Sequence, residues 1–464
     1  MQSDDTSQDW LAGFVRHNGP LYLQIVRLVE QGVASGTLRA GDRMTPQREV
    51  AARLGVDLTT VTRAYDEGRR RQLLVTAGRR GTYVAARRIE LVQMVDLSLN
   101  IPPLPADLDL GDLLRKGLNQ ALLQSDADLL MTYHLGGGSE LDRTAAALWL
   151  APMLGPVDPA LITAVSGAQA ALCALIMATT RPDDVLLCDS FVYPGFRSAA
   201  AQLGRRVEDV DSDDSGMTPE SLEQQCRRFG AKLLYLNPTI QNPTTVTMPE
   251  RRRKAIARLA ARLELQVIED DPYWLLADQA PPPFTRFAPE RTHYVSTLSK
   301  CLCPGLRTAF VRSPCARSRA ALLDAVRSFS LMRAPLSAVL VTQWINDGTA
   351  RRLLAGVRAE TRARQRLAAQ SLAGMHGTAH MSNEGAHLWH RLPGYWTPEA
   401  FVREAGWKGL AITPSDAFAS APRSPAAIRI SLGGVPDRRQ LALALGQLSA
   451  LLARVPDERA RAVI

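Results

Sequence analysis

The sequence predicts an α/β protein in two parts: a small N-terminal winged helix-turn-helix and a larger body built on a sheet. Within the first 86 residues, short helical patterns are followed by two apolar runs that flank a glycine-bounded turn. From Asp96 onward, apolar strand-like runs alternate with helical stretches, which is the signature of a parallel sheet covered by helices on both faces. With 464 residues and 46% hydrophobic content, the chain can form two or three domains with large cores.

The composition excludes several classes of protein. Charged residues make up 22% of the chain and glycine and proline are at ordinary levels, which argues against long disordered regions. The six cysteines are scattered, and no C-x-x-C pair or histidine cluster suggests a metal site. We find no signal peptide and no apolar run long enough to cross a bilayer, so we expect a reduced, cytoplasmic protein with no membrane partner.

The first helix is predicted from Pro20 to Gly36, because apolar residues recur there at every fourth position. A second, short helix is predicted over residues 46–54, with Thr45 as its N-cap and Gly55 as its stop.

The third helix starts after Asp57 and runs into Arg71, and its spacing from the second is that of a helix-turn-helix. Two apolar runs, 73–75 and 82–84, then bracket a tip that carries Arg79 and Arg80, which predicts the hairpin of a winged helix.

Positive charge is concentrated in this head. The chain carries a formal charge of +9, and residues 1–88 hold fourteen arginines against nine acids, which gives +5. Between residues 63 and 88, eight arginines face two acids, which gives +6. Such a patch suits a polyanion, and hydroxyls with Arg63 in the first turns of the third helix stand where a recognition helix meets base edges.

The stretch from Pro20 to Val84 resembles the winged-helix head of GntR-type bacterial repressors. The matching pieces are residues 36–38, 41–43, 48–51, 54–56 and 60–65. Leu58 stands where that family often has a DNA-contacting arginine. We therefore expect the head to bind operator DNA, and the candidate contacts are Arg48, Thr59, Thr60, Thr62, Arg63, Arg79 and Arg80.

In parallel sheets, ligands bind at the carboxyl ends of the strands, so the residues that follow each predicted strand indicate the chemistry of the body. The strands predicted over 161–165, 184–187, 232–236, 265–268 and 293–295 lead, in that order, into the turn 166–169, Tyr193, the polar loop 237–245, the acids 269–271 and the stretch around Lys300. The turn opens a helix and exposes backbone N–H groups to an anion. Three consecutive acids are costly to bury unless a positive group meets them.

Lys300 is one of only five lysines, against fifty arginines. A lysine can lose its proton when it is desolvated and can then attack a carbonyl, whereas arginine stays charged. Arg307 lies seven residues further on and can grip a phosphate with two N–H groups. An anion turn, a carboxylate, an amine and an aromatic ring together suit pyridoxal 5′-phosphate (PLP).

Residues from about 96 to 440 resemble fold-type I aminotransferases, the aspartate aminotransferase superfamily, with the matches in the family's order. The resemblance implies a fold-type I PLP-dependent transferase fold: a mixed, mostly parallel sheet with a smaller α+β domain. It makes Lys300 the Schiff-base lysine and Asp270 the partner of the pyridine nitrogen, and it gives Tyr273 and Asn242 to the O3′ oxygen; Lys300, Asp270 and Tyr273 are the predicted catalytic set.

By the same resemblance, further residues of the family's site can be named. The phosphate would contact Gly167, Ala168, Gln169, Thr297 and Arg307, Tyr193 would stack on the ring, and Arg429 would clamp a substrate carboxylate. Tyr133 corresponds to the tyrosine that reaches the phosphate of a partner subunit, which implies a homodimer.

These patterns predict the following boundaries: a flexible tail over 1–15, a winged helix-turn-helix over 16–86, a linker over 87–95, and a PLP-binding body over 96–464, with a large subdomain of about 130–340 and a small one of about 96–129 plus 345–464.

A GntR-like head joined to an aminotransferase-like body resembles the MocR subfamily of bacterial regulators. We therefore favour a PLP-dependent transcriptional regulator that responds to a small amino compound or to PLP. Two alternatives stay open: an aminotransferase with an auxiliary DNA-binding head, and a DNA-binding repressor whose body binds no cofactor.

Overall fold

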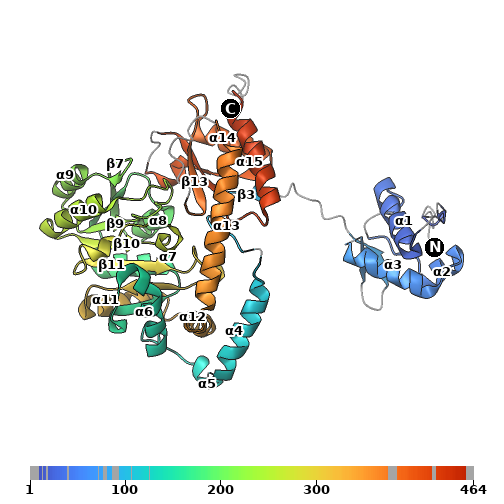
Figure 1. The fold of residues 1–464 in the computed structure, drawn as a ribbon, viewed down its shortest axis with the longest axis horizontal. Helices are drawn as coiled ribbons and strands as arrows, with labels where there is room; N and C mark the ends of the chain where they lie inside the picture. Colours follow the sequence, from blue (N-terminus) through green and yellow to red (C-terminus); the bar gives the residue numbers. More distant parts are fainter. Residues whose placement is uncertain are drawn as a thin grey trace, which may run out of the picture. The chain divides into compact units, whose positions relative to one another are not determined.

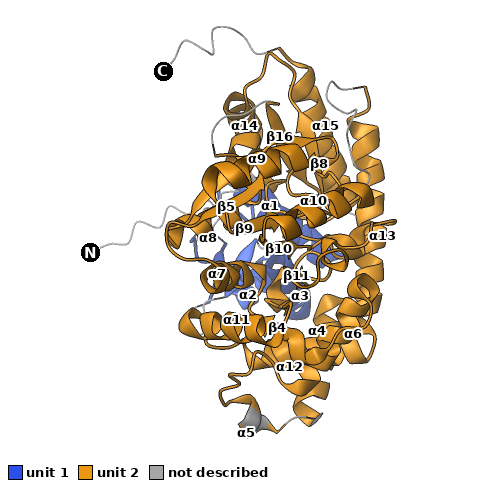
Figure 2. Cartoon of the chain, turned by 90° about the vertical axis from the view of Figure 1, so that its left-hand side faces the viewer, with its two compact units in different colours: residues 1–93 blue, residues 94–464 orange. Residues whose placement is uncertain are grey.

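The computed structural model describes residues 10–12, 14–16, 19–38, 41–71, 73–76, 81–85, 94–105, 107–124, 126–374, 384–420 and 425–455. The chain divides into two compact units, Met1–Gln93 and Met94–Ile464, which Figure 2 distinguishes by colour. Among the helices that the structure describes, none is both long and apolar enough to cross a membrane.

Unit 1 contains three helices and a two-stranded antiparallel sheet. Their bounds are α1 (Leu21–Ser35), α2 (Gln47–Leu54), α3 (Leu58–Arg70), β1 (Leu74–Thr76) and β2 (Thr82–Val84). Ile25 of α1, Val50 of α2 and Val61 of α3 are completely buried in one core. The predicted order of three helices followed by a hairpin is confirmed, whereas the tip with Arg79 and Arg80 lies outside the described residues.

The local signals in unit 1 were partly correct. Gly36 and Gly55 end α1 and α2 with φ of 77° and 59°, a left-handed conformation that glycine adopts without steric cost. Thr45 is not the N-cap of α2, because that position belongs to Pro46. The Thr45 hydroxyl instead accepts a hydrogen bond from Trp10 Nε1 at 3.1 Å.

This contact also corrects the predicted tail. Trp10 and Leu11 are buried in the core of the head, so they belong to the head and not to a flexible segment over residues 1–15.

Unit 2 is organised around a seven-stranded sheet with the order β4-β12-β11-β10-β9-β5-β6. Three of its strands, β9, β10 and β11, are labelled in Figure 1. The bounds are β4 (Ile162–Val165), β5 (Val185–Asp189), β6 (Arg206–Val210), β9 (Leu233–Leu236), β10 (Gln266–Asp270), β11 (Thr292–Thr297) and β12 (Ala309–Arg312). β12 is antiparallel to both of its neighbours, and the other adjacent strands are parallel. The predicted mixed, mostly parallel sheet is confirmed.

Helices cover both faces of this sheet because successive side chains of a strand point to opposite sides. Leu186 and Cys188 of β5 pack in one cluster with α7 and α8, while Val185 and Leu187 pack in another with α9 and α10. The helices of this part are α6 (Glu140–Leu154), α7 (Ala168–Thr179), α8 (Pro194–Gln202), α9 (Pro219–Phe229), α10 (Glu250–Arg262), α11 (Ala316–Phe329) and α12 (Pro335–Asn346). Short elements complete it: β7 (Ser212–Asp213), β8 (Gly216–Met217), and 3-10 turns at Pro159–Leu161, Trp274–Leu276, Phe284–Arg286 and Pro304–Leu306.

A smaller α+β part has its own core. It contains β3 (Val95–Asp96), β13 (His387–Arg391), β14 (Leu410–Ala411), β15 (Thr413–Pro414), β16 (Ala427–Ser431), α13 (Thr349–Ser371), α14 (Pro398–Trp407), α15 (Arg438–Ala453) and a 3-10 turn at Ser415–Phe418. Leu97, which directly follows β3, is completely buried among residues of α13, α14 and α15.

Two helices near the start of unit 2, α4 (Leu110–Gln124) and α5 (Ala127–Leu130), precede α6. Leu113 and Leu118 of α4 pack against the core that contains α6 and α12.

The positive group that the acids 269–271 require is Arg253 of α10, which is completely buried. Its guanidinium donates to Pro238 O at 2.9 Å and to Thr239 Oγ1 at 3.0 Å, and its charge acts on Glu269 and Asp271.

The two outer acids, Glu269 and Asp271, tolerate burial for different reasons. Glu269 accepts from the backbone N–H groups of Phe284 and Thr285 at 2.6 and 2.7 Å. Burial, helped by the charge of Glu269, raises the pKa of Asp271 to about 8.

Arg253→Met removes the only completely buried cation of α10. The change leaves the backbone oxygens of Pro238, Met248 and Pro282 without their donor, and it leaves the buried acids Glu269 and Asp271 without the neighbouring positive charge. We expect the free energy of unfolding to fall by about 3–5 kcal/mol. Urea titration followed by tryptophan fluorescence measures this, because six of the seven tryptophans lie in residues 94–464. The exposed Arg258 of the same helix supplies the matched control Arg258→Met, which should change stability by less than about 0.5 kcal/mol. Equal effects of the two variants would contradict this role of Arg253.

Candidate functional site

The predicted lysine lies where β11 ends and meets residues from distant parts of unit 2. Lys300 Nζ donates a hydrogen bond to the main-chain oxygen of Asn100. Removal from water and the charges of Arg429 and Arg307 lower the pKa of Lys300 to about 8, against an opposing effect of Asp270. A substantial fraction of this amine is therefore neutral, and nucleophilic, near neutral pH.

Asp270 ends β10 and is only 5% exposed. One carboxylate oxygen, Oδ2, accepts from the hydroxyl of Tyr235 at 2.8 Å, whereas Oδ1 is buried and has no hydrogen-bond partner among the described residues. Burial raises the pKa of Asp270 to about 6, so the carboxyl is mostly ionised at pH 7. A buried, ionised oxygen without a donor is suited to an N–H group of a bound molecule.

The turn that the sequence predicts to bind an anion lies at the start of α7. Gly167, with φ of 95°, is the N-cap of α7 and no side chain caps the helix, so the N–H groups from Ala168 onward are not used by a side-chain cap. Arg307 donates to Ser166 O at 3.3 Å, and a Cβ added at Gly167 would lie 3.0 Å from its guanidinium. The turn and the guanidinium therefore lie together, as a phosphate site requires.

Other predicted phosphate and ring residues surround this turn. Gln169 donates to Gly195 O at 2.9 Å, and the Tyr193 ring lies against the same glycine. The Thr297 hydroxyl is 3.2 Å from the Ser299 hydroxyl, directly before Lys300. Burial raises the pKa of Tyr193, and the charges of Asp270, Arg307 and Arg429 also act on its hydroxyl. The structure therefore brings these groups close to one another.

A second cation lies on the other side of the lysine. Arg429 of β16 donates to Asn242 Oδ1 at 2.8 Å and to Ser98 O at 2.5 Å, and its guanidinium lies 4.9 Å from the centre of the Phe418 ring. Tyr273 accepts a hydrogen bond from the Asn100 side chain at 2.8 Å.

Tyr133 is 74% exposed on the surface of the chain, and Arg307 is the other predicted cofactor-binding residue that is exposed.

Sequence reasoning missed Ser98, Asn100, Tyr235 and His387. Asn100 Nδ2 lies 3.2 Å from Nδ1 of the buried His387, beside Tyr273. Tyr235 lies in a strand that was predicted, and alternation along that strand would have placed it on the same face as Asp270. For Ser98 and Asn100 the sequence gives no comparable signal. Ser98 contacts Arg429 through its backbone oxygen, and Asn100 contacts Lys300 through its backbone oxygen and meets Tyr273 and His387, which are distant in sequence, through its side chain.

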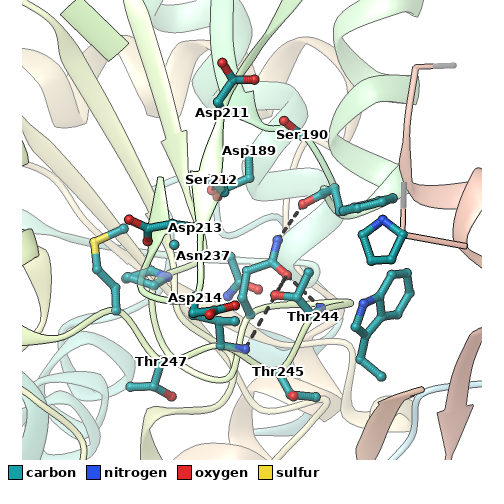
Figure 3. Close-up of a pocket in the computed structure, with 18 of the residues that line it drawn as sticks. Asp189, Ser190, Asp211, Ser212, Asp213, Asp214, Asn237, Thr244, Thr245 and Thr247 are labelled. Carbon is teal, nitrogen blue, oxygen red and sulfur yellow. Dashed lines mark hydrogen bonds between the residues drawn. The ribbon is translucent and has the colours of Figure 1, made fainter. Parts of the chain in front are cut away.

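A separate cavity of about 620 Å³ borders the loop 237–248 (Figure 3). Asp189, Asp211, Asp213 and Asp214 line it, and none of the predicted cofactor-binding residues is among the described residues that do. Its carboxylates already have partners within the protein: Asp189 accepts from Ser212 at 2.9 Å, and Asp213 accepts from Arg252 at 2.7 Å. We assign no ligand to it.

In unit 1, the candidate DNA contacts of α2 and α3 are mostly on the surface. Arg48 and Thr59 are exposed and Thr60 is half-buried. Thr62 donates to Gln47 Oε1 at 2.9 Å, and the Arg63 guanidinium lies 4.1 Å from the centre of the Tyr22 ring, so both side chains are held in place.

The arginine run at the end of α3 is less available than its charge implies. Arg69 pairs with Asp66, Arg70 pairs with Glu67 at 2.5 Å, and Arg71 pairs with Glu67 at 2.9 Å and with Glu30 of α1 at 3.0 Å. These ion pairs offset much of the local positive charge of the run.

Comparison with known proteins assigns both units. Residues 92–446 match the family described as aminotransferase class I and II, and residues 21–84 match the family described as bacterial regulatory proteins, gntR family. Among solved structures, the kynurenine aminotransferase of Pyrococcus horikoshii superposes with a TM-score of 0.70 at 24% identity, covering 78% of this chain and 91% of that one, which shows the fold.

Two relatives that match over most of this chain and most of their own length are named as regulators. The vitamin B6 salvage pathway transcriptional repressor PtsJ of Salmonella typhimurium is 30% identical over 89% of this chain and 94% of its own length. The uncharacterized HTH-type transcriptional regulator YdeF of Bacillus subtilis is 27% identical over 96% of both chains. The chain therefore belongs to the aminotransferase class I and II family and, through its gntR-type head, is a DNA-binding transcriptional regulator with the MocR architecture.

Proposed function

We propose that this regulator holds pyridoxal 5′-phosphate at Lys300 and that an amino compound entering the same site changes its affinity for operator DNA. The observation that carries the proposal is that the buried Asp270 carboxylate, one of whose oxygens has no donor among the described residues, lies close enough to Lys300 for their charges to interact. These two groups lie in the same chain as a helix-turn-helix.

The residues of the site fit this cofactor. Gly167, the start of α7 and Arg307 form a cradle for a phosphate, and the Tyr193 ring offers a flat surface next to it. When bound, the cofactor supplies an electrophilic carbonyl and a conjugated ring that withdraws electrons from the attached group.

Each residue then has a separate task. Lys300 provides the neutral amine that attaches the carbonyl, and Asp270 holds a proton at the ring nitrogen through Oδ1. Tyr273 and Asn242 donate toward the ring oxygen, and Arg429 pairs with the carboxylate of the amino compound.

The head supplies the output. Exposed Arg48 and Thr59 and half-buried Thr60 offer a guanidinium and hydroxyls to DNA from α2 and α3. An amino compound that binds one arrangement of the protein more tightly than another shifts the balance between them, and DNA affinity changes by the same coupling factor.

We propose in addition that the regulator is a homodimer. Met131, Tyr133 and Leu141 are 83%, 74% and 72% exposed, an unusual concentration of apolar surface near the start of α6. Burial of this surface against a second copy would also bring Tyr133 to the partner's cofactor site, as the family resemblance implies.

Transamination is a second candidate function, favoured by the joint presence of Lys300, Asn242 and Arg429 around one site. Relatives over the body include aromatic-amino-acid aminotransferase 1 of Thermococcus litoralis, which is 25% identical over 69% of this chain and 80% of its own length.

The central test measures DNA binding and turnover on the same sample. Duplexes selected from a random library by the PLP-loaded protein serve as the operator, and fluorescence anisotropy gives the Kd with and without each member of a panel of amino acids. We expect at least one amino acid to change the Kd by about fivefold or more, the lower range of known couplings. Lys300→Ala should bind the duplex without this response, because the head is intact. If no amino acid changes the Kd of the wild type while the protein forms oxo acids continuously, transamination is favoured over a sensing role for the site.

The pH dependence of cofactor attachment tests the assignment of Lys300. Because its pKa is lowered to about 8, the neutral amine increases about tenfold per pH unit below 8 and levels off above it. The initial rate at which PLP develops the protein-bound visible absorbance band should follow this curve. N-acetyl-lysine methylamide should show a rate that still increases above pH 9.5, and Lys300→Ala should show no protein-bound band. A rate for the wild type that follows the free lysine would rule out a desolvated nucleophile.

The dimer proposal is tested with one charge on the apolar surface. Leu141→Asp places a carboxylate where an apolar contact is expected, so the dissociation constant of the dimer should rise about tenfold or more. Leu443 of α15 is 64% exposed and gives the matched control Leu443→Asp, which should leave the constant unchanged. Sedimentation velocity over a range of concentrations measures both, and identical profiles would exclude this surface from the interface.

A further inference from the structure

The main chain enters unit 2 through a segment that contacts two of the three cations of the site. We call residues 96–100 the entry segment. Asn100 O accepts from Lys300 Nζ, and Ser98 O accepts from Arg429 Nη2 at 2.5 Å. Two backbone oxygens, two residues apart, thus hold the amine and the guanidinium that the proposed function uses for its ligands.

A ligand competes for these same hydrogen bonds. A carbonyl that is attached to Lys300 removes N–H donors from the amine, and a carboxylate that pairs with Arg429 is a stronger acceptor than the neutral Ser98 oxygen. Ser98 O also accepts from the hydroxyls of Thr413 and Ser431 at 3.4 Å, whereas Lys300 is the donor to Asn100 O among the described residues. Because buried backbone oxygens are nearly always paired, loss of the Lys300 donor favours a movement of the entry segment that gives Asn100 O another partner.

The entry segment is built to move as one piece. The Asp96 carboxylate accepts from the backbone N–H of Ser98 at 2.7 Å, from its hydroxyl at 2.6 Å and from the N–H of Leu99 at 3.1 Å. This closes a tight turn in which the positions of Ser98 O and Asn100 O depend on each other.

The residues around the entry segment hold it against β14 and β16, so a displacement of either strand reaches it. Leu97 lies between two strands, since its N–H donates to Ala411 O at 2.9 Å and its oxygen accepts from Ser431 N at 2.7 Å. After β16, a Cβ added at Gly433 would lie 1.8 Å from Ile101 O, so the two backbones touch directly. A shift of Arg429 with β16 therefore cannot leave the entry segment in place.

We propose that the entry segment is the element that senses occupancy of the site and passes it to the DNA-binding head, a proposal that rests on the proposed function. The segment directly follows, in the chain, the residues that join the body to residues 1–93. Asp96 is the positioning residue of this device, because it fixes the turn without contacting Lys300 or Arg429 itself.

The first measurement is hydrogen–deuterium exchange of the full-length wild type, with and without PLP and then with a responsive amino acid. Peptides that cover residues 94–101 should change their exchange rate at least twofold on each addition. A peptide from α9, which packs in a different core from Leu97, should not change, and it serves as an internal control. The visible absorbance band is recorded on the same samples, so cofactor loading is scored separately.

The second measurement uses Asp96→Ala with Asp96→Asn and the exposed Asp107→Ala as controls. Asp96→Ala should form the visible band like the wild type, while the amino-acid effect on the DNA Kd shrinks to less than twofold. Asp96→Asn keeps one oxygen that can accept the Ser98 and Leu99 N–H groups, so it should restore part of the response, and Asp107→Ala should retain all of it.

The outcomes separate the two proposals. If no band forms in the wild type, both fall. If the band forms and the wild type responds, but exchange of residues 94–101 is unchanged or Asp96→Ala responds like the wild type, the proposed function stands and the sensing role of the entry segment is overturned. If Asp96→Ala does not fold, Asp96→Asn and the exchange data on the wild type decide in its place.

Discussion

The site depends on how β10 distributes three consecutive carboxyl groups. Successive side chains of a strand alternate between the two faces of a sheet, so Glu269 and Asp271 point one way and Asp270 points the other. On the first face the completely buried Arg253 meets the two outer acids, and hydrogen bonds to Glu269 complete their solvation. Asp270 is left on the face of Tyr235 and Lys300, with one oxygen that has no donor among the described residues. Without Arg253, all three carboxyl groups would oppose burial of this strand end.

This distribution gives the site an excess of positive charge. The positive charges of the site are those of Lys300, Arg307 and Arg429, and Asp270 supplies the opposing negative charge. Arg307 and Arg429 both lower the pKa of Lys300, so anionic ligands that pair with the two guanidinium groups would reduce the repulsion among the three cations. A phosphate beside Arg307 and a carboxylate beside Arg429 would meet this requirement.

Local signals predicted the features that local chemistry controls, and tertiary contacts explain the rest. Gly36 and Gly55 end helices because their own φ angles are positive, and Lys300, Asp270 and Arg307 were found because each follows a strand with a distinctive composition. Arg253 could not be recognised, since its partners lie in a different strand and loop and its own helix is rich in arginine. The charge of the run 69–71 was overestimated because Glu30, forty-one residues before Arg71, comes close only in the folded head. Ser98 and Asn100 contribute main-chain oxygens, which every residue possesses, so no sequence pattern marks them.

Contacts made by main-chain oxygens explain how an aminotransferase-like body can serve a regulator. A sensor made of backbone oxygens needs no residue beyond those that hold the cofactor and the carboxylate, because Lys300 and Arg429 already donate to it. What it needs is a chain path, and the entry segment provides one by following directly on the linkage to the head. The contacts of Leu97 with both β14 and the end of β16 mean that movement of Arg429 and movement of the segment are one event.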